Sequence, residues 1–163
     1  MTALTRRERR TLDAIAARIF PATDTPGAVE VGAVDYVDRA LAGAYRRLLP
    51  RYRRGLGEIE RHSIETMSRS FTELVPDEQD AVLLDLEAGR LTTIRDGAEL
   101  FRIIRRHVLE GVFCEPQYGG NRDLAGWRLV GFPGQQHGYA NAYINKVVDI
   151  PPIAVDSTQT VES

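Results

Sequence analysis

The sequence has a single cysteine and a single lysine among 163 residues, and it lacks long apolar runs. Cys114 has no partner for a disulfide within the chain, and it excludes a zinc site made of several cysteines. No run approaches the roughly 18 apolar residues of a transmembrane helix. The formal net charge is −2, so the molecule as a whole lacks the positive charge of a typical nucleic-acid-binding protein. We therefore expect one domain with an ordinary apolar core.

The basic residues are almost all arginine, because Lys146 is the only lysine. Arginines cluster at residues 6–10, 51–54 and 105–106, each time with acidic residues close by, which favours solvated helix faces. A twin-arginine export signal also needs an apolar segment and a cleavage site of small residues, and neither follows the N-terminal arginines. We expect a cytoplasmic chain, or a periplasmic one if it is exported with a partner or has lost a leader.

Apolar residues at helical spacing predict an all-α fold, a small bundle of about five helices. Thr5 and Glu8 have the spacing of a capping box, and the helix that follows them ends at Pro21. Three later helices begin near Pro50, Pro76 and Gly97. The second helix should bury three apolar residues and turn three charged residues to solvent: Val34, Val37 and Leu41, and Asp35, Asp38 and Arg39.

Helical periodicity ends near Pro116, and residues 116–138 are rich in glycine. Trp127, Leu129, Val130 and Phe132 make this stretch too apolar for a flexible linker, so we expect an ordered loop. A further short element is expected around 139–144, through Tyr139, Tyr143 and Ile144. Residues 1–150 should form a single helical domain that includes the loop, and 151–163 an extended or disordered tail.

The loop sequence YGGNRDLAGWRLVGFPG, at 118–134, contains residue types common in active sites. Its glycines follow a helix, whereas a phosphate-binding loop lies between a strand and a helix, so a phosphate site is disfavoured. A metal site would need closely paired ligands, and His62, His107 and His137 are scattered along the chain.

The sequence also contains two candidate catalytic pairs. Cys114 with His107 or His137 would make a nucleophile and base, but a cysteine directly after Val112-Phe113 is better explained as a buried, inert one. Asp123 and Glu115 would make a carboxylate pair, but an aspartate beside an arginine in such a loop commonly stabilises its own turn.

Aromatic residues and arginine on an ordered loop have the composition of an interface hot spot. Trp127 and Phe132 could alternatively fold back into the core of the domain, and the loop could do both. We expect no catalytic, cofactor-binding or metal-binding residue in this chain. The residues expected at a partner interface are Tyr118, Asn121, Arg122, Asp123, Trp127 and Phe132.

The same residues carry a resemblance to a known family. Phe113, the run from Tyr118 to Asp123, Gly126-Trp127, and the run from Gly131 to Gly134 are similar to the signature of the gluconate 2-dehydrogenase subunit 3 family. The resemblance extends from about Leu4 to about Tyr143. Its N-terminal part consists of Leu12 to Pro21, the loop with Asp24 and Pro26-Gly27-Ala28, and Val34 to Asp38.

This resemblance implies a non-catalytic small subunit that binds and stabilises the catalytic subunit of a sugar, glycoside or polyol dehydrogenase. The implied partner is a large flavoprotein of the glucose-methanol-choline (GMC) type, which binds FAD, and many complexes add a cytochrome c subunit. The chain itself would then hold no cofactor, insert into no membrane and bind no nucleic acid. Two other functions stay open: an independent enzyme that uses Cys114 or Asp123, and an arginine-rich nucleic-acid-binding domain.

Overall fold

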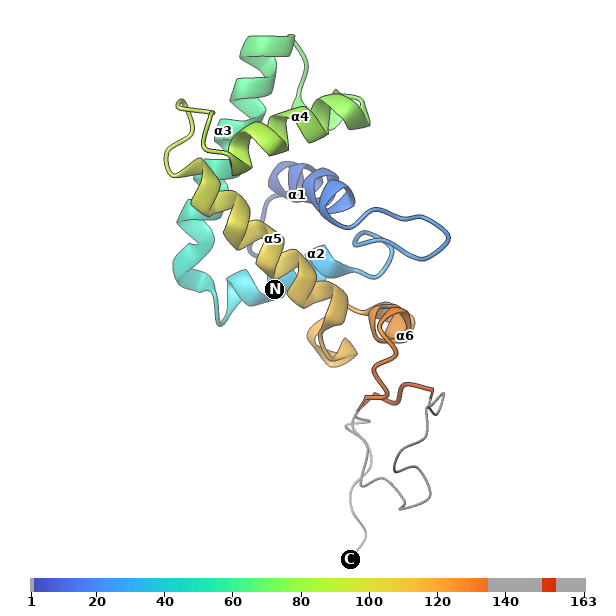
Figure 1. Cartoon of the computed structure of the whole chain (residues 1–163). Helices are drawn as coiled ribbons and strands as arrows, with labels where there is room; N and C mark the ends of the chain where they lie inside the picture. The colour runs from blue at the N-terminus through green and yellow to red at the C-terminus, as the bar shows by residue number, and fades with distance from the viewer. Residues whose placement is uncertain (1, 135–150, 155–163) are drawn as a thin grey trace, which may run out of the picture.

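The computed structural model describes residues 2–134 and 151–154. In these residues the fold is all-α, as the sequence predicts, without a named strand (Figure 1). The α-helices are α1 (Arg6–Ile19), α2 (Ala33–Ala42), α3 (Leu49–Met67), α4 (Pro76–Glu87), α5 (Gly97–Phe113) and α6 (Ala125–Leu129). Short 3-10 helices precede α3, α4 and α6: η1 (Arg46–Leu48), η2 (Phe71–Glu73), and the pair η3 (Pro116–Tyr118) and η4 (Arg122–Leu124).

The five helices predicted from periodicity are confirmed, and their ends follow from local chemistry. The Thr5 hydroxyl accepts from the Glu8 backbone N–H at 3.3 Å, while the Glu8 carboxylate accepts from the Thr5 N–H at 2.7 Å. This reciprocal capping box satisfies two backbone donors at the start of α1. Pro50 and Pro76 lie in the first turns of α3 and α4, where a missing N–H costs no helical hydrogen bond.

Two expectations about this part of the fold were wrong. Asp38 does not face solvent: it is buried on α2, and its Oδ1 accepts the backbone N–H groups of Ala3 and Leu4, each at 2.8 Å. The carboxylate thereby fastens the segment before α1 to α2. In addition, the glycine-rich stretch is not purely a loop, because residues 125–129 form the short helix α6.

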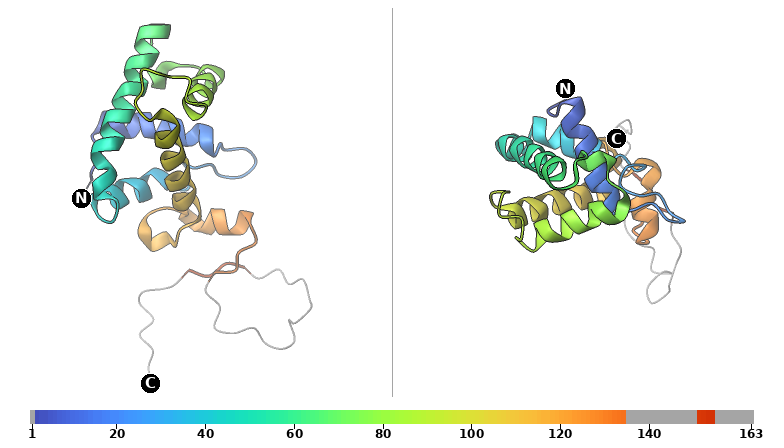
Figure 2. Two further views of the ribbon diagram at one scale, coloured as in Figure 1. Left: turned by 60° about the vertical axis from the view of Figure 1, so that its left-hand side comes forward. Right: turned by 90° about the horizontal axis from the view of Figure 1, so that it is seen from above.

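Helix α5 occupies the centre of the bundle and contacts α1, α2, α3, α4 and α6. Figure 2 shows α4 and α6 toward opposite ends of the bundle, with α5 connecting the two ends. Gly55 of α3 allows a close crossing, because a Cβ there would lie 2.2 Å from a methyl carbon of Leu100 on α5. The largest fully buried side chains include Tyr52, Phe71, Leu12 and Ile104.

A buried histidine connects α5 to α3 and to the turn before it. The His107 ring stacks on Tyr45 with centroids 4.3 Å apart, and its Nδ1 lies 2.9 Å from the Tyr52 hydroxyl. Its Nε2 lies 3.2 Å from the Arg106 guanidinium, which can only donate, so we assign the proton of the neutral ring to Nδ1. Burial lowers the pKa of His107, since the charged ring would lose its hydration.

The described structure ends where two distant segments meet. Gly134 forms an isolated parallel bridge with Ile153, whose N–H donates to the Pro133 carbonyl at 3.1 Å. The predicted element around Tyr139, Tyr143 and Ile144, and also His137, lie outside the described residues. None of the helices within 2–134 combines the length and apolar character needed to span a bilayer.

Candidate docking surface

Asn121 holds the segment after α5 in place. Its side chain is 0% exposed; the amide NH₂ donates to the Cys114 carbonyl and the amide oxygen accepts from the Gly126 N–H, both at 2.9 Å. Its backbone N–H donates to the Gly111 carbonyl at 3.0 Å. One residue thus joins the end of α5 to the start of α6. Asn121 has φ 48°, a left-handed conformation that asparagine adopts more readily than most residues.

Glycines let three backbone segments approach one another here. A Cβ on Gly120 would lie 2.0 Å from the Gly111 carbonyl oxygen, and one on Gly126 would lie 2.2 Å from the Val112 carbonyl oxygen. A Cβ on Gly111 would itself lie 2.6 Å from the Ala33 carbonyl oxygen of α2. Any larger residue at these positions would push the loop off α5, or α5 off α2. The close contacts explain these glycines without a phosphate ligand.

Arg122 connects this loop to the N-terminal half of the chain. Its backbone N–H donates to the Val31 carbonyl at 3.0 Å, and its guanidinium pairs with the Asp35 carboxylate on α2. Arg9 of α1 pairs with the other oxygen of Asp35 at 2.5 Å. The N-terminal and C-terminal segments that carry the family resemblance therefore pack against each other in space.

Trp127 faces inward and Phe132 faces outward. Trp127 is 5% exposed, and its Nε1–H donates to the Phe113 carbonyl at 2.7 Å. Phe132 contacts the Trp127 ring edge-on, with centroids 4.9 Å apart, yet stays 47% exposed. Tyr118, on η3, is 57% exposed.

The six residues predicted at an interface therefore fall into two groups. Asn121 and Trp127 are buried in this chain, so in this structure they shape the loop and do not present a side chain to a partner. Their burial is explained by hydrogen bonding, because each side chain donates to a backbone carbonyl at the end of α5. The other four are at the surface, and of these Arg122 is already paired: Tyr118, Arg122, Asp123 and Phe132.

The sequence reasoning missed the exposed apolar residues beside Phe132. Leu129 and Val130 end α6, and Ile153 lies next to Pro133 through its backbone hydrogen bond. All three side chains are about half exposed to solvent. We call Leu129, Val130, Phe132 and Ile153 the α6 patch. The sequence identifies Leu129 and Val130 only as apolar members of the loop, because the apolar spacing in a helix of five residues is too short to indicate which side is buried.

The geometry around Cys114 does not resemble an activated nucleophile. Burial raises the pKa of the Cys114 thiol, whereas nucleophilic cysteines have a lowered pKa. Both ring nitrogens of His107 are occupied by Tyr52 and Arg106. Asp123 lies exposed at φ 56°. Within the described residues, no group of three or more His, Cys, Asp or Glu side chains is placed to hold a metal ion.

A pocket with a volume of about 700 Å³ opens between α2 and the end of α5, and residues of η3 also line it. Tyr36 and Tyr45 donate their hydroxyls to one oxygen of Glu110, at 3.2 and 3.0 Å. Burial, followed by the charge of Glu110, raises the pKa of Tyr36, so the phenol stays protonated at neutral pH. The polar groups of the pocket therefore satisfy one another.

Comparison with protein families gives a match to the family described as gluconate 2-dehydrogenase subunit 3, over residues 6–134. The match begins with the first residue of α1 and ends at Gly134, so it includes both halves of the packed signature. No curated protein and no solved structure matches the chain significantly. Because the family match covers most of the sequence, the chain belongs to the gluconate 2-dehydrogenase subunit 3 family, named for a subunit of a dehydrogenase complex.

Proposed function

We propose that this chain is a non-catalytic small subunit that binds and stabilises the FAD-dependent catalytic subunit of a GMC-type sugar, glycoside or polyol dehydrogenase. FAD belongs to that partner in this proposal, and a cytochrome c subunit would be a further member of the complex. Family membership supports a role as a subunit. The observation that carries the docking role is the α6 patch.

The α6 patch has the features of a protein-binding surface. Leu129, Val130 and Phe132 follow closely along the backbone at the end of α6, and the Pro133–Ile153 hydrogen bond brings the backbone of Ile153 beside this segment. Large apolar side chains that are exposed together commonly mark an interaction site, whereas single ones need no explanation. An aromatic residue among them, supported by a buried tryptophan, resembles the anchor of an interface hot spot.

The loop that precedes the α6 patch in the chain is held rigidly, which favours tight binding. Asn121, Arg122 and Trp127 each use a side chain or backbone group to fasten it to α2, α5 or the loop before α2. A surface that already has its bound shape loses little conformational entropy when a partner docks. The polar residues that first resembled an active site thus support recognition.

The two alternative functions have less support. An enzyme that used Cys114 would need a lowered thiol pKa and a free base, but burial raises the pKa of this thiol, and both ring nitrogens of His107 have partners; His137 lies outside the described residues. A nucleic-acid-binding domain would fit the arginine content, but the formal charge of the chain is −2.

The proposal is tested by purifying the tagged full chain from its source organism. We expect a yellow preparation with the absorbance spectrum of a flavin, a large second chain and sugar-dependent reduction of a dye. A colourless preparation that contains this chain alone would refute the proposal. Replacing Cys114 with alanine and Asp123 with asparagine should leave the dehydrogenase activity of the complex unchanged, and loss of activity would favour the enzyme alternative.

The position of the interface is tested with matched variants. Leu129→Asp combined with Val130→Asp should weaken binding of the flavoprotein by at least about 30-fold, as expected for two hot-spot residues. The control is Leu84→Asp combined with Val75→Asp, because Leu84 is 59% and Val75 53% exposed on α4 and the turn before it. Equal loss of binding in the two double variants would exclude the α6 patch as the docking surface.

A further inference from the structure

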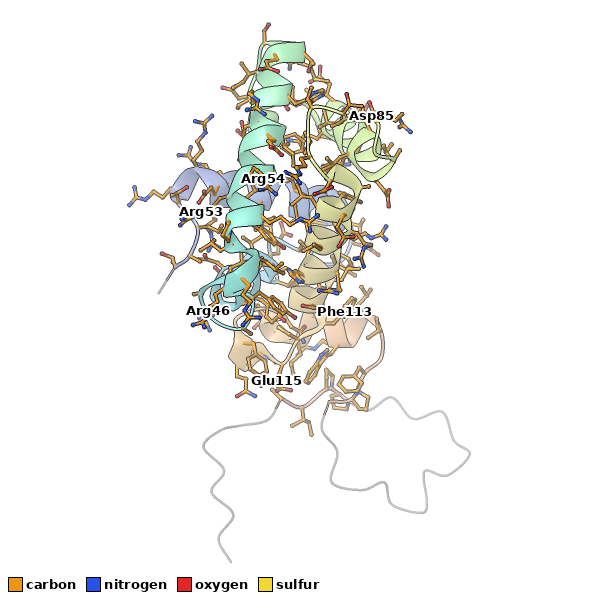
Figure 3. The ribbon with its side chains drawn as sticks, turned by 90° about the vertical axis from the view of Figure 1, so that its left-hand side faces the viewer. Arg46, Arg53, Arg54, Asp85, Phe113 and Glu115 are labelled. Atoms are coloured by element: carbon orange, nitrogen blue, oxygen red, sulfur yellow. The ribbon has the colours of Figure 1, made fainter. Side chains whose placement is uncertain are left out.

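Four arginines form a cationic surface on the side of the bundle that carries α3. Arg46 and Arg47 lie on η1, and Arg51 and Arg54 lie on the first half of α3. Figure 3 looks onto this side and shows Arg46 and Arg54 along the lower half of α3. We call Arg46, Arg47, Arg51 and Arg54 the α3 arginine surface.

These arginines differ from most others in having no acidic partner. None of the four lies within 4.0 Å of a carboxylate oxygen of the described residues. Arg53, in the same stretch, points elsewhere and pairs with Glu8 at 3.6 Å. Farther along, Arg61 and Arg69 pair with Glu65 and Glu78. Along η1 and α3, the arginines without an ion pair therefore lie at the beginning of α3 and in the turn before it.

Carboxylates near this surface cancel its charge only in part, because the charge of Arg51 acts on Glu99 of α5. Glu99 of α5 is bound by Arg102 in two hydrogen bonds of 2.8 and 2.7 Å, which is the main reason that the pKa of Glu99 is lowered. Glu58, one turn after Arg54, is half-buried and has one oxygen turned into the protein. Of the four arginines, Arg46, Arg47 and Arg54 are exposed and Arg51 is half-buried.

The composition of this surface fits phosphate groups better than a second protein. A protein interface needs apolar anchors, and the exposed large apolar residues of the described chain lie elsewhere, with Ile64 the nearest on α3, beyond Arg54. One guanidinium group can bind two phosphate oxygens at once. It is also weakly hydrated, so it loses little hydration free energy when it binds phosphate. Clusters of four or more basic residues are typical of surfaces that are attracted to anionic lipids.

We propose that the α3 arginine surface binds the headgroups of anionic phospholipids and holds the subunit against a membrane without insertion. Binding of lipid at the α3 arginine surface leaves the α6 patch accessible. Figure 2 shows α3 along one side of the bundle and α6 on the other, so both surfaces can be occupied together. This binding would orient a complex at the bilayer, and it does not depend on which protein covers the α6 patch.

The test is flotation of the full chain with vesicles in a density gradient, because aggregated protein sinks while bound protein rises. Vesicles of phosphatidylglycerol and phosphatidylcholine should carry the chain upward at low salt, and vesicles of phosphatidylcholine alone should not. The variant Arg47→Gln, Arg51→Gln, Arg54→Gln should lose on the order of 100-fold in affinity, at about fivefold per arginine. Higher salt should weaken wild-type binding, since it screens exposed charges.

Two matched variants decide whether charge at this position is responsible. Arg61→Gln, Arg69→Gln, Arg90→Gln removes equal charge from exposed, paired arginines and should float as the wild type does. Arg47→Lys, Arg51→Lys, Arg54→Lys keeps the charge and should also float, and far-UV circular dichroism checks that each variant is folded. The proposal is overturned if the wild type binds neutral vesicles equally, fails to float at low salt, or binds a short DNA duplex more tightly than anionic vesicles. Equal flotation of the glutamine variant and the wild type would also overturn it.

Discussion

Replacing Asn121 with alanine should strongly destabilise the chain. The variant leaves the Cys114 carbonyl and the Gly126 N–H without the partners that they have at 2.9 Å in the wild type. The residue is 0% exposed, so water cannot replace the lost hydrogen bonds without opening the structure. The alanine must also adopt the left-handed backbone, with φ 48°, which asparagine tolerates better.

These effects give a magnitude. Each of the two buried polar groups that lose their partner costs roughly 1–3 kcal/mol, and a left-handed alanine adds about 1 kcal/mol, so the loss is on the order of 3–7 kcal/mol. Domains of this size are stable by only about 5–15 kcal/mol in total. Asn121→Gly loses the same side chain but adopts the left-handed backbone freely, so it should be more stable than Asn121→Ala by about 1 kcal/mol.

The assay is urea unfolding of the full chain, followed by far-UV circular dichroism. Ser68→Ala is the control, because Ser68 has φ 55° at the end of α3 but is exposed, and the change should cost no more than about 1 kcal/mol. If Asn121→Ala unfolds within 1 kcal/mol of the wild type, the loop does not depend on these two hydrogen bonds. If Asn121→Gly is no more stable than Asn121→Ala, the backbone contribution is wrong.

Three further predictions concern stability and use the same unfolding assay. Gly126→Ala should cost at least about 2 kcal/mol, because its Cβ would lie 2.2 Å from the Val112 carbonyl oxygen. Gly57→Ala, with nothing within 4 Å of its Cβ, should instead stabilise α3 by about 0.5–1 kcal/mol. The opposite order of stability would contradict the packing. Trp127→Phe should cost about 1–2 kcal/mol through the unpaired Phe113 carbonyl, and an unchanged midpoint would show that water replaces the indole. The pKa of His107 is lowered in the folded chain, so the unfolded state binds more protons, and stability should fall as the pH drops below about 6.5. His107→Gln should flatten this slope, and an equal slope in both proteins would show that other groups cause it.

The helices could be predicted from the sequence because their signals are local. Capping residues, prolines at helix starts and apolar residues at helical spacing act within one or two turns, and α1 to α5 followed from them. Asp38 was misplaced although a signal was present: it lies four residues after Val34 and three before Leu41, on the buried side of α2. A charged residue at such a position predicts a buried hydrogen-bonding role, here for Ala3 and Leu4.

The candidate site could be predicted only as a region. Its residues stand out by composition, but the direction of each side chain depends on contacts between segments about 90 residues apart, such as Arg122 with Asp35, whose separation is 87. No local rule distinguishes the buried Trp127 from the exposed Phe132. Helix α6 was missed because five residues that begin after two left-handed ones, Asp123 and Leu124, provide no periodicity.

The way in which the loop is fastened also sets the order in which the chain can fold. The groups that hold residues 119–127 come from elsewhere: the carbonyls of Gly111 and Val31, the carboxylate of Asp35, and Gly32, which lies close to Gly119 and Arg122. The loop can therefore take its shape only after α2 and α5 have packed together. A partner that recognises the α6 patch would bind completed subunits and reject partly folded ones, so assembly of the complex would itself act as a check on folding.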